Sequence, residues 1–371
     1  MFNDGMVDTL KLIKLVERGV TSRYRSDLNR GVIMRELGFG IIGCSRIAAK
    51  HAEALAHIEQ AQLVAVMDID EARAKEYAEA YGCEYYTKLD DILGRPDIQV
   101  VNICTPNGLH AEQGIKAARA GKHILVEKPV ALTLESADAL IEACEQEGVK
   151  LGVVHQNRFL PPVLKAREAL ERGRFGRLTH GQATVRWNRN QEYYDQADWR
   201  GTREMDGGML LNQAIHNLDL LQWFMGPVES VFGYAGTKVR NIETEDVAVA
   251  VVRFDSGAFG VIEAATTIYP KNLEERLSIF GETGTVVIGG TALSRVEAWE
   301  FPGGEEEREK LVGQGLELPR YYGHQQVILD MIDAVRNDRR PAVDGREARK
   351  VLELILAIYE SSKTGREVKL R

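Results

Sequence analysis

The sequence GFGIIGCSRIAAKH, residues 38–51, contains two overlapping glycine patterns of the kind that holds the phosphates of a dinucleotide. The first pattern begins at Gly38 and fits the spacing GxGxxG letter for letter, whereas the second begins at Gly43 and fits it imperfectly. A phosphate-binding loop must follow a strand and open a helix, because a helix N-terminus supplies unpaired N–H groups and a favourable dipole. ELGFGIIG is the expected strand, and SRIAAKHAEALAHI continues with helical periodicity. Only the second pattern therefore lies at the junction.

This junction predicts a dinucleotide-binding loop. We expect Gly43 to make the tight turn, Ser45 to let the backbone approach the pyrophosphate, and Ala48 to permit close packing of the helix on the strand. Arg46 and Ile47 open the expected helix, and we expect them beside the cofactor as well.

A carboxylate follows the next expected strand. The segment QLVAVMDID places Asp68 25 residues after Gly43, where an acidic side chain accepts hydrogen bonds from the ribose hydroxyls of the adenosine. The same charge would repel a 2′-phosphate, so Asp68 favours NAD over NADP. The alternative is an ordinary acidic residue in the turn that ends a strand.

Strands and helices alternate through residues 34–155, which predicts a doubly wound parallel sheet, the Rossmann domain of an α/β protein. Ligands of such sheets bind at the carboxyl ends of the strands. Two short segments stand at these ends, CTPN at 104–107 and EKP at 127–129. We expect cofactor contacts there from Thr105, Pro106, Asn107, His110, Glu127 and Lys128.

With these segments the chain resembles the Gfo/Idh/MocA oxidoreductases, the relatives of glucose–fructose oxidoreductase and inositol dehydrogenase. The resemblance begins with ILVEKP behind a TPN…H turn. It continues with DGGMLLNQAIHNLDLLQWFMG (206–226), which looks like the family's helix GGGxxxDxxxHxxD, and with the C-terminal DGREARKVLELILAIYESSKTGREVKL. It covers about residues 34 to 371. It implies an NAD-dependent enzyme that transfers hydride between a sugar hydroxyl carbon and nicotinamide.

The helix also makes chemical sense by itself. Asn212 and His216 are four residues apart and share a face, while the segment 206–208 offers a polar N-cap and room for a ligand. Asn212 stands where the family usually has Asp, and an amide takes no proton, so an Asp–His dyad is ruled out; Asn212 can still orient a hydroxyl or His216. Oxidation of an alcohol needs a base, and we assign this role to Lys128 and His216 together, since burial beside the cofactor lowers a lysine pKa. The alternative for His216 is a core histidine.

Residues 156–371 are expected to form an α+β domain for substrate binding and oligomerisation. Long alternating segments, such as DVAVAVVRFDSGAFGVIEAATTIY, predict a large, mostly antiparallel sheet. In DVAVAVVRF both alternating sets of side chains are apolar, so neither face of the strand suits water. We therefore expect an open-faced sheet that assembles the chain into a homo-oligomer, a tetramer, as the resemblance also implies. We expect the C-terminal helix to pack back on the first domain.

Basic residues indicate an anionic substrate. The stretch 158–189 contains eight Lys or Arg against two Glu, in a chain whose net charge is −8. The segments YPKNLEE (269–275) and GETGTVVIGGTAL (281–293) look like the branch of the family that oxidises UDP-N-acetylglucosaminuronic acid (UDP-GlcNAcA) at the 3-hydroxyl. We expect strand-end arginines to hold the uronate or pyrophosphate. The expected substrate residues are Arg158, Arg186, Asn188, Asn212, His216 and Lys271.

Two other functions stay open. One is an inositol or other simple sugar dehydrogenase of the same family, which the usual Asp at position 212 would have favoured. The other is a ligand-sensing regulator on the same fold, against which Lys128 and His216 count. A zinc-dependent alcohol dehydrogenase is disfavoured, and we expect no metal, because no Cys/His set has ligand spacing.

Composition bounds the remaining classes. With 371 residues, 44% hydrophobic and 27% charged, the chain is an ordinary globular protein, and its negative charge argues against nucleic acid. No apolar run approaches a membrane span, and the four cysteines form no CxxC pair, so we expect a cytoplasmic protein with reduced thiols. Residues 1–33 are expected to be a non-native or disordered extension, with Met34 as the natural start; the alternative is a genuine N-terminal helix.

Overall fold

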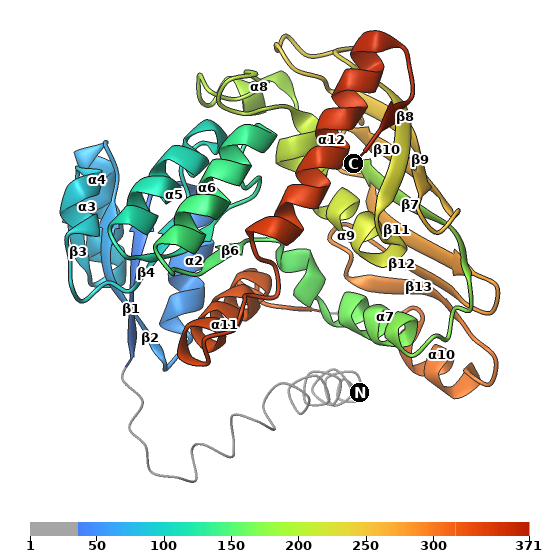
Figure 1. The fold of residues 1–371 in the computed structure, drawn as a ribbon, viewed down its shortest axis with the longest axis horizontal. Coiled ribbons are helices and arrows are strands. Elements are labelled where there is room, and N and C mark those ends of the chain that lie inside the picture. Colours follow the sequence, from blue (N-terminus) through green and yellow to red (C-terminus); the bar gives the residue numbers. More distant parts are fainter. Residues whose placement is uncertain (1–35, 316, 371) are drawn as a thin grey trace.

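The first residues of the glycine-rich stretch, 38–42, lie in β1, one of the two central strands of a six-stranded sheet in the computed structural model, which describes residues 36–315 and 317–370 (Figure 1). The strand order is β3-β2-β1-β4-β5-β6 and every neighbouring pair is parallel, as in doubly wound dinucleotide-binding sheets. The predicted Rossmann domain is therefore confirmed, whereas the expectations for residues 1–33 lie outside the described residues. The strands are β1 (Leu37–Ile42), β2 (Ala61–Met67), β3 (Glu84–Tyr86), β4 (Val100–Ile103), β5 (His123–Val126) and β6 (Leu151–Val153).

Helices cover both faces of this sheet. One face packs against α2 (Arg46–Ala56), α3 (Glu71–Tyr81) and α11 (Tyr322–Arg336), and α11 reaches it from the far end of the chain. The other face packs against α4 (Leu89–Leu93), α5 (His110–Arg119) and α6 (Leu134–Gln146). Both faces of the parallel strands are thus buried, which explains their nearly continuous apolar sequences.

The two glycine patterns have separate structural reasons. A Cβ atom at Gly38 would lie 1.8 Å from the carbonyl oxygen of Asp97, so Gly38 allows the chain to cross closely beside β1. Gly43 follows the end of β1 with φ of +89°, and its Cβ would lie 2.8 Å from Thr105 Cγ2. Ser45 then occupies the N-cap of α2. The second pattern is therefore the strand-to-helix turn, as predicted.

The second half of the chain forms an eight-stranded sheet in the order β13-β12-β11-β7-β10-β9-β8-β14. Within the described part of this second sheet, β7 and β10 pair in parallel and all other neighbouring strands pair antiparallel, which confirms the predicted mostly antiparallel sheet. The strands are β7 (Leu178–Arg186), β8 (Val228–Gly236), β9 (Val247–Phe254), β10 (Phe259–Ala265), β11 (Glu274–Gly281), β12 (Thr285–Gly289), β13 (Arg295–Glu300) and β14 (Val368–Lys369).

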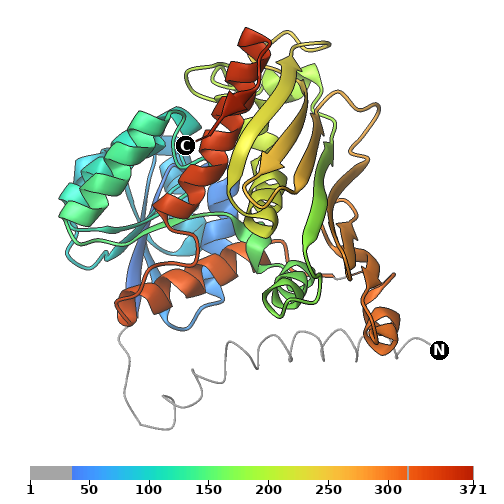
Figure 2. The same ribbon diagram turned by 45° about the vertical axis from the view of Figure 1, so that its right-hand side comes forward.

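This sheet is covered on one face only. Helices α9 (Ile215–Met225) and α12 (Gly345–Thr364) lie on the face turned toward the first domain, and α12 also contacts α6 (Figure 2). Neither view shows a helix of the described chain on the opposite face. There, Val249 is 46% exposed, Val251 55% and Phe259 58%. The open apolar face that the alternation predicted is therefore present.

Smaller elements connect the two sheets and close the domain edges. Within the described residues, no helix is both long and apolar enough to cross a bilayer. All four cysteines are free thiols, and three of them are buried. The connecting elements are α7 (Pro161–Glu171), α8 (Gln191–Tyr194), α10 (Glu305–Leu311) and the short 3₁₀ turns Asn107–Leu109 and Gln156–Phe159.

Candidate active site

The turns that follow β1 and β2 are joined by hydrogen bonds to the side chain of Asp68. The backbone N–H of Cys44 donates to Asp68 Oδ2 at 2.9 Å, and the N–H of Asp70 donates to Oδ1 at 2.9 Å. Asp68 is buried, and Arg73 Nη1 lies 3.4 Å from Oδ2. Each carboxylate oxygen has two lone pairs, so Asp68 can still accept hydrogen bonds from ribose hydroxyls.

The first turn of α2 presents the groups expected for a pyrophosphate. Ser45 has an extended backbone and donates from Oγ to the carbonyl of Cys104 at 2.9 Å, which ties the β1 turn to the end of β4. Its backbone carbonyl accepts from Tyr77. Arg46 is exposed and Ile47 half-buried at the helix start. A glycine turn, a free helix N-terminus and a buried carboxylate on the next strand together suit NAD.

The ends of β4 and β5 are joined by His110. Its ring nitrogens lie 2.7 Å from the carbonyl oxygen of Pro129 and 2.9 Å from that of Thr105. Burial lowers the pKa of His110, so the neutral ring donates to one carbonyl at a time. Asn107 is also buried and donates to the carbonyl of Asp206 at 2.8 Å, which connects the first domain to the loop before the helix that carries Asn212 and His216. These two predicted cofactor residues therefore also hold the site together.

Lys128 contacts the helix that carries Asn212 and His216 directly. Its Nζ donates to the backbone carbonyl of Asn212 at 2.6 Å and approaches Asn212 Oδ1 at 3.4 Å. Burial lowers the pKa of Lys128, the charges of Glu127 and Asp206 raise it, and Arg189 adds to the lowering. The net direction is downward, which increases the neutral fraction that can accept a proton. Two of the three residues predicted to be catalytic, Lys128 and Asn212, are therefore in contact.

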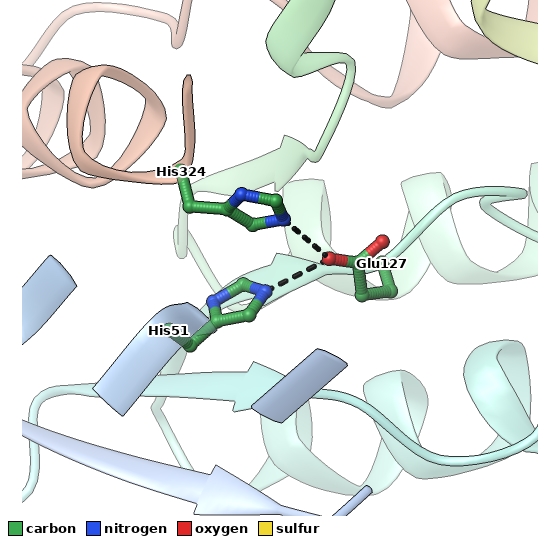
Figure 3. A group of neighbouring side chains, drawn as sticks. All are labelled: His51, Glu127 and His324. Atoms are coloured by element: carbon green, nitrogen blue, oxygen red, sulfur yellow. Dashed lines mark hydrogen bonds and ion pairs between the residues drawn. The ribbon is translucent and has the colours of Figure 1, made fainter. Parts of the chain in front are cut away.

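Glu127 is held by two histidines from different parts of the chain (Figure 3). His51 Nε2 on α2 lies 2.9 Å from Glu127 Oε1, and His324 Nε2 on α11 lies 3.4 Å from the same oxygen. Burial opposes ionisation, but the two imidazoles outweigh it and hold the pKa of Glu127 well below its usual value. A fixed negative charge therefore stands immediately before Lys128. Neither histidine was identified from the sequence.

The composition of this cluster, two histidines and a glutamate, is also that of a metal site. The amide nitrogen of Asn102 lies 3.0 Å from His51 Nδ1, so Nδ1 accepts and the ring proton sits on Nε2. This tautomer, inferred from the hydrogen-bond partners, directs an N–H group at Glu127 instead of a lone pair at an ion. The residues therefore fit a hydrogen-bonded cluster better than a metal centre.

The helix that carries Asn212 and His216 begins differently from the prediction. Leu210–Ala214 forms a π-helical turn before α9, a feature frequent at functional sites. The backbone N–H of Leu210 donates to Glu245 Oε1 at 2.8 Å, so Glu245 caps this end and the expected cap by Asp206 is wrong. A Cβ at Gly208 would lie 2.5 Å from Glu245 Oε2. The glycine makes room for this cap.

His216 lies beside two residues that follow β6. Gln156 Nε2 is 3.2 Å from His216 Nε2, and the ring of His155 meets that of His216 edge-on at 5.8 Å between centroids. His216 Nδ1 has no hydrogen-bond partner among the described residues. Burial and the charge of Lys128 hold the pKa of His216 well below its usual value. His155 and Gln156 were missed, although the end of β6 is a strand end like the other two.

Arg158 and Arg186 already have acidic partners. Arg158 is buried and donates from Nη2 and Nε to Asp219 at 2.7 and 2.8 Å. Arg186 donates to Glu263 and Glu274. Gly181 faces α9, so the period-two alternation of β7 places Arg186 on the open face of the sheet, away from α9. The charges of both predicted substrate residues are therefore matched by carboxylates of the protein.

Asn188 follows β7 and Lys271 precedes β11, and a bridge between Asn188 and Thr267 joins the two segments. The Asn188 side-chain amide donates to the carbonyl of Ile268, while its backbone N–H donates to Asn272 Oδ1 at 2.9 Å. It thereby fastens the loop that carries Lys271, which is exposed. Both positions are compatible with substrate contact through the loop.

Arg189 has only neutral hydrogen-bond partners. It donates to Gln213 Oε1 at 2.9 Å, to the Asn188 carbonyl at 2.7 Å and to Asn272 Oδ1 at 3.2 Å. In the part of the chain that the structure describes, no ion pair involves it. Burial raises the pKa of the nearby Glu275 to about 8, so that side chain is largely neutral at pH 7. Arg189 therefore carries a charge without a neighbouring carboxylate in contact.

Family models match both domains. The model described as "Oxidoreductase family, NAD-binding Rossmann fold" matches residues 37–155, and the "GFO/IDH/MocA C-terminal domain" matches residues 163–287. The myo-inositol 2-dehydrogenase of Thermotoga maritima is 30% identical over 339 residues, which cover 89% of this chain and 98% of that protein.

Two solved structures are similar over almost the whole described chain. The WlbA dehydrogenase from Bordetella pertussis, in complex with NADH and UDP-GlcNAcA, has a TM-score of 0.85 at 38% identity and covers 92% of this chain and 99% of its own. The WlbA dehydrogenase from Chromobacterium violaceum, in complex with the same two molecules, has a TM-score of 0.85 at 40% identity and covers 92% and 97%.

Proposed function

Because this chain belongs to the Gfo/Idh/MocA family, and is an NAD-dependent oxidoreductase acting on CH–OH groups, we propose that it oxidises the 3-hydroxyl of a UDP-N-acetylhexosaminuronate such as UDP-GlcNAcA. NAD, when bound, accepts the hydride at its nicotinamide ring. The chain's own task is then to bind the sugar nucleotide, to orient the 3-hydroxyl and to remove its proton.

Lys128 and His216 are the proposed base. Both have lowered pKa values, because burial disfavours their charged forms, and both lie at the junction of β5, β6 and the catalytic helix. The amide nitrogen of Gln156 donates to His216 Nε2, so Nδ1 carries the proton of the neutral ring; Nδ1 has no partner among the described residues and can donate a hydrogen bond to the substrate hydroxyl. Asn212 orients Lys128 through its carbonyl and amide oxygens. The role of base is proposed for Lys128 and His216 as a pair.

The cofactor contacts are proposed from the strand ends. The turn at Gly43 and the N-terminus of α2 would receive the pyrophosphate, and Asp68 the adenosine ribose. The end of β5 would face the nicotinamide through Lys128. The full proposed set is Gly43, Ser45, Arg46, Ile47, Asp68, Thr105, Pro106, Asn107, His110, Glu127 and Lys128.

The unneutralised charge of Arg189 is the observation that carries the substrate proposal. Arg189 lowers the pKa of Lys128 and hydrogen-bonds to Gln213, the residue after Asn212, so it lies close to the base. Its guanidinium also stacks on Trp187 at 4.6 Å. An arginine held by neutral partners beside the base suits a carboxylate or phosphate, whereas a neutral polyol would leave its charge unmatched. Lys271 would add a contact from the loop.

The test is steady-state NADH formation with UDP-GlcNAcA and with myo-inositol. Arg189→Ala should raise KM for UDP-GlcNAcA about 10- to 100-fold, since a hydrogen bond to a charged group contributes about 1.5–3 kcal/mol, with a smaller effect on kcat. Arg186→Ala is the matched control and should leave KM nearly unchanged. KM for UDP-GlcNAcA should also rise with salt, because ions screen charges. Turnover of inositol but not of UDP-GlcNAcA would refute the substrate proposal.

An inositol or other simple sugar dehydrogenase is the second candidate. The observation that favours it is the similarity to the Thermotoga maritima enzyme over 89% of this chain. The same assay separates the two, because a neutral polyol should give rates that are independent of salt and of Arg189.

We further propose a cytoplasmic homotetramer that uses the open face of the second sheet. The exposed apolar side chains of β9 and β10 support this, since such a face is costly to leave in water. Free thiols fit a reducing compartment. Light scattering that finds a stable monomer at micromolar concentration would refute the assembly.

A further inference from the structure

A buried carboxylate lies directly behind Asn212. Asp206 is 3% exposed, and its Oδ1 accepts a hydrogen bond from the Asn212 side-chain amide. Its Oδ2 accepts from the backbone N–H of Gly201 at 2.8 Å. Its carbonyl accepts from Asn107 at 2.8 Å. Asp206 is therefore fixed from both domains and directs one oxygen at the amide that meets Lys128.

The contact with Asp206 decides which way the Asn212 amide faces. An ionised carboxylate only accepts, so it takes the NH₂ group of the amide and leaves Oδ1 on the opposite side. That oxygen lies 3.4 Å from Lys128 Nζ. The amide thus connects a buried negative charge to the amine, and the charge of Asp206 is among the causes that raise the pKa of Lys128 against burial.

Both residues depart from the motif GGGxxxDxxxHxxD. Counted back from His216, Asn212 occupies the aspartate position and Asp206 the first glycine position. Asn212 places an amide where the motif has a carboxylate. Asp206, six residues earlier, supplies a carboxylate that is hydrogen-bonded to this amide.

We propose that Asp206 is a positioning residue, which supplies through the Asn212 amide the negative charge that the helix lacks at position 212. This inference rests on the part of the proposed function that makes Lys128 a base, but not on the identity of the sugar. Asp206 holds Asn212 Oδ1 toward Lys128 and so keeps the amine in place for proton removal.

The surroundings of Asp206 make its charge dependent on pH. Burial raises the pKa of Asp206 to about 6, although Gly201 and Asn212 hydrogen bonds and the charge of Lys128 favour the ionised form. A protonated Asp206 could donate to Asn212 Oδ1 and would turn the amide, so the arrangement is lost as the pH falls through about 6. The charged or titratable groups that face it are Lys128, Arg200, Tyr194, Glu245 and Tyr359.

A four-member variant cycle tests the proposal with any sugar that the wild type oxidises. Asp206→Asn removes the charge and should lower kcat about 10- to 100-fold with KM nearly unchanged, since small displacements of a reacting group have effects of this size. The acidic limb of its kcat–pH profile should move to lower pH, because the pKa of Lys128 falls. Asn212→Asp places two carboxylates in contact, one of which must hold a proton, and should be partly active.

The double variant Asp206→Asn/Asn212→Asp exchanges the two groups and restores one carboxylate and one amide in contact. It should recover at least about 10-fold of the kcat lost in Asp206→Asn, a non-additive result that a merely structural role would not give. Its acidic limb should lie at higher pH than that of Asp206→Asn. If kcat recovers in the double variant while its melting temperature is no higher than that of Asp206→Asn, a larger folded fraction cannot be the cause of the recovery.

Asp246→Asn is the matched control. Asp246 is equally buried and accepts the backbone N–H groups of Lys238, Val239 and Arg240, so its loss should lower stability but leave the pH profile unchanged. An unshifted limb in Asp206→Asn, or additive losses in the double variant, would overturn the proposal while Lys128→Ala remains inactive. If Lys128→Ala kept near-normal kcat, the base assignment would fail and this inference with it.

Discussion

Replacing Arg158 by methionine should destabilise the fold and leave the KM of the folded enzyme nearly unchanged. Arg158 and Asp219 form two hydrogen bonds of 2.7 and 2.8 Å, and Arg158 is 6% and Asp219 2% exposed. Methionine fills much of the volume but leaves the carboxylate buried without its cation. Breaking a buried pair in this way costs about 3–5 kcal/mol of unfolding free energy. His155 Nδ1, 3.6 Å from Asp219, is largely neutral at pH 7 because burial lowers its pKa.

The loss should depend on pH. Burial alone would raise the pKa of Asp219, but Arg158 outweighs it and holds the pKa below its usual value. In the wild type this pair therefore stabilises the protein above the unfolded-state pKa of about 4, and the contribution fades as the pH falls through the folded-state pKa. Without Arg158 the pKa of Asp219 in the folded state rises. The loss of unfolding free energy relative to the wild type should therefore become smaller as the pH falls from about 8 to about 5.

Urea unfolding followed by circular dichroism, with KM measured on the same preparations, is the assay. Arg346→Met is the control, because Arg346 also pairs with a carboxylate, Glu145 at 2.7 Å, but both side chains are about half exposed. That pair should contribute about 0–1 kcal/mol. A loss below about 1 kcal/mol for Arg158→Met, together with a clear rise in KM, would refute this reasoning and return Arg158 to the substrate site.

Three further predictions concern the cofactor, the base and the assembly. The wild type should prefer NAD to NADP in kcat/KM and Asp68→Ser should narrow the gap; equal values for the wild type would contradict the role of Asp68. Lys128→Ala and His216→Ala should each lower kcat about 10²- to 10⁴-fold while NADH still binds, as followed by its fluorescence, and near-normal kcat would remove that residue from catalysis. Val251→Asp should convert the oligomer to smaller species in light scattering, and an unchanged mass would show that the open face is not the interface.

The sequence alone was enough to predict a feature correctly where the residue at that position had a single physical explanation. The strand–turn–helix order selected Gly43 over Gly38 as the phosphate turn, and the positive φ at Gly43 is the reason. The alternation in β9 predicted one covered and one exposed apolar face, because side chains of a strand alternate strictly. Lys128 and Asn212 were predicted to share a site, and they are in contact.

The sequence alone was not enough to predict the role of a side chain that depends on a partner distant along the chain. Arg158 and Arg186 look alike as basic residues near strand ends, but Asp219 neutralises the first, and the strand pleat turns the second toward the open face. Arg189 has no acidic partner within the described residues, and no local pattern of the sequence reveals this. His324 reaches Glu127 from α11, and nothing in the helical periodicity of that segment indicates this contact.

Lys128 is surrounded by carboxylates that raise its pKa and by an arginine that lowers it, and this arrangement favours an anionic substrate. Glu127 and Asp206 raise its pKa, and both are buried and held by hydrogen bonds, so their influence is the same with or without a ligand. Arg189 lowers it and has neutral partners only, so its influence can be offset by a ligand. In the free enzyme Arg189 keeps Lys128 closer to its neutral form and attracts an anion. A bound carboxylate or phosphate would then match the arginine charge, whereas a neutral polyol would leave an uncompensated cation beside the base throughout the reaction.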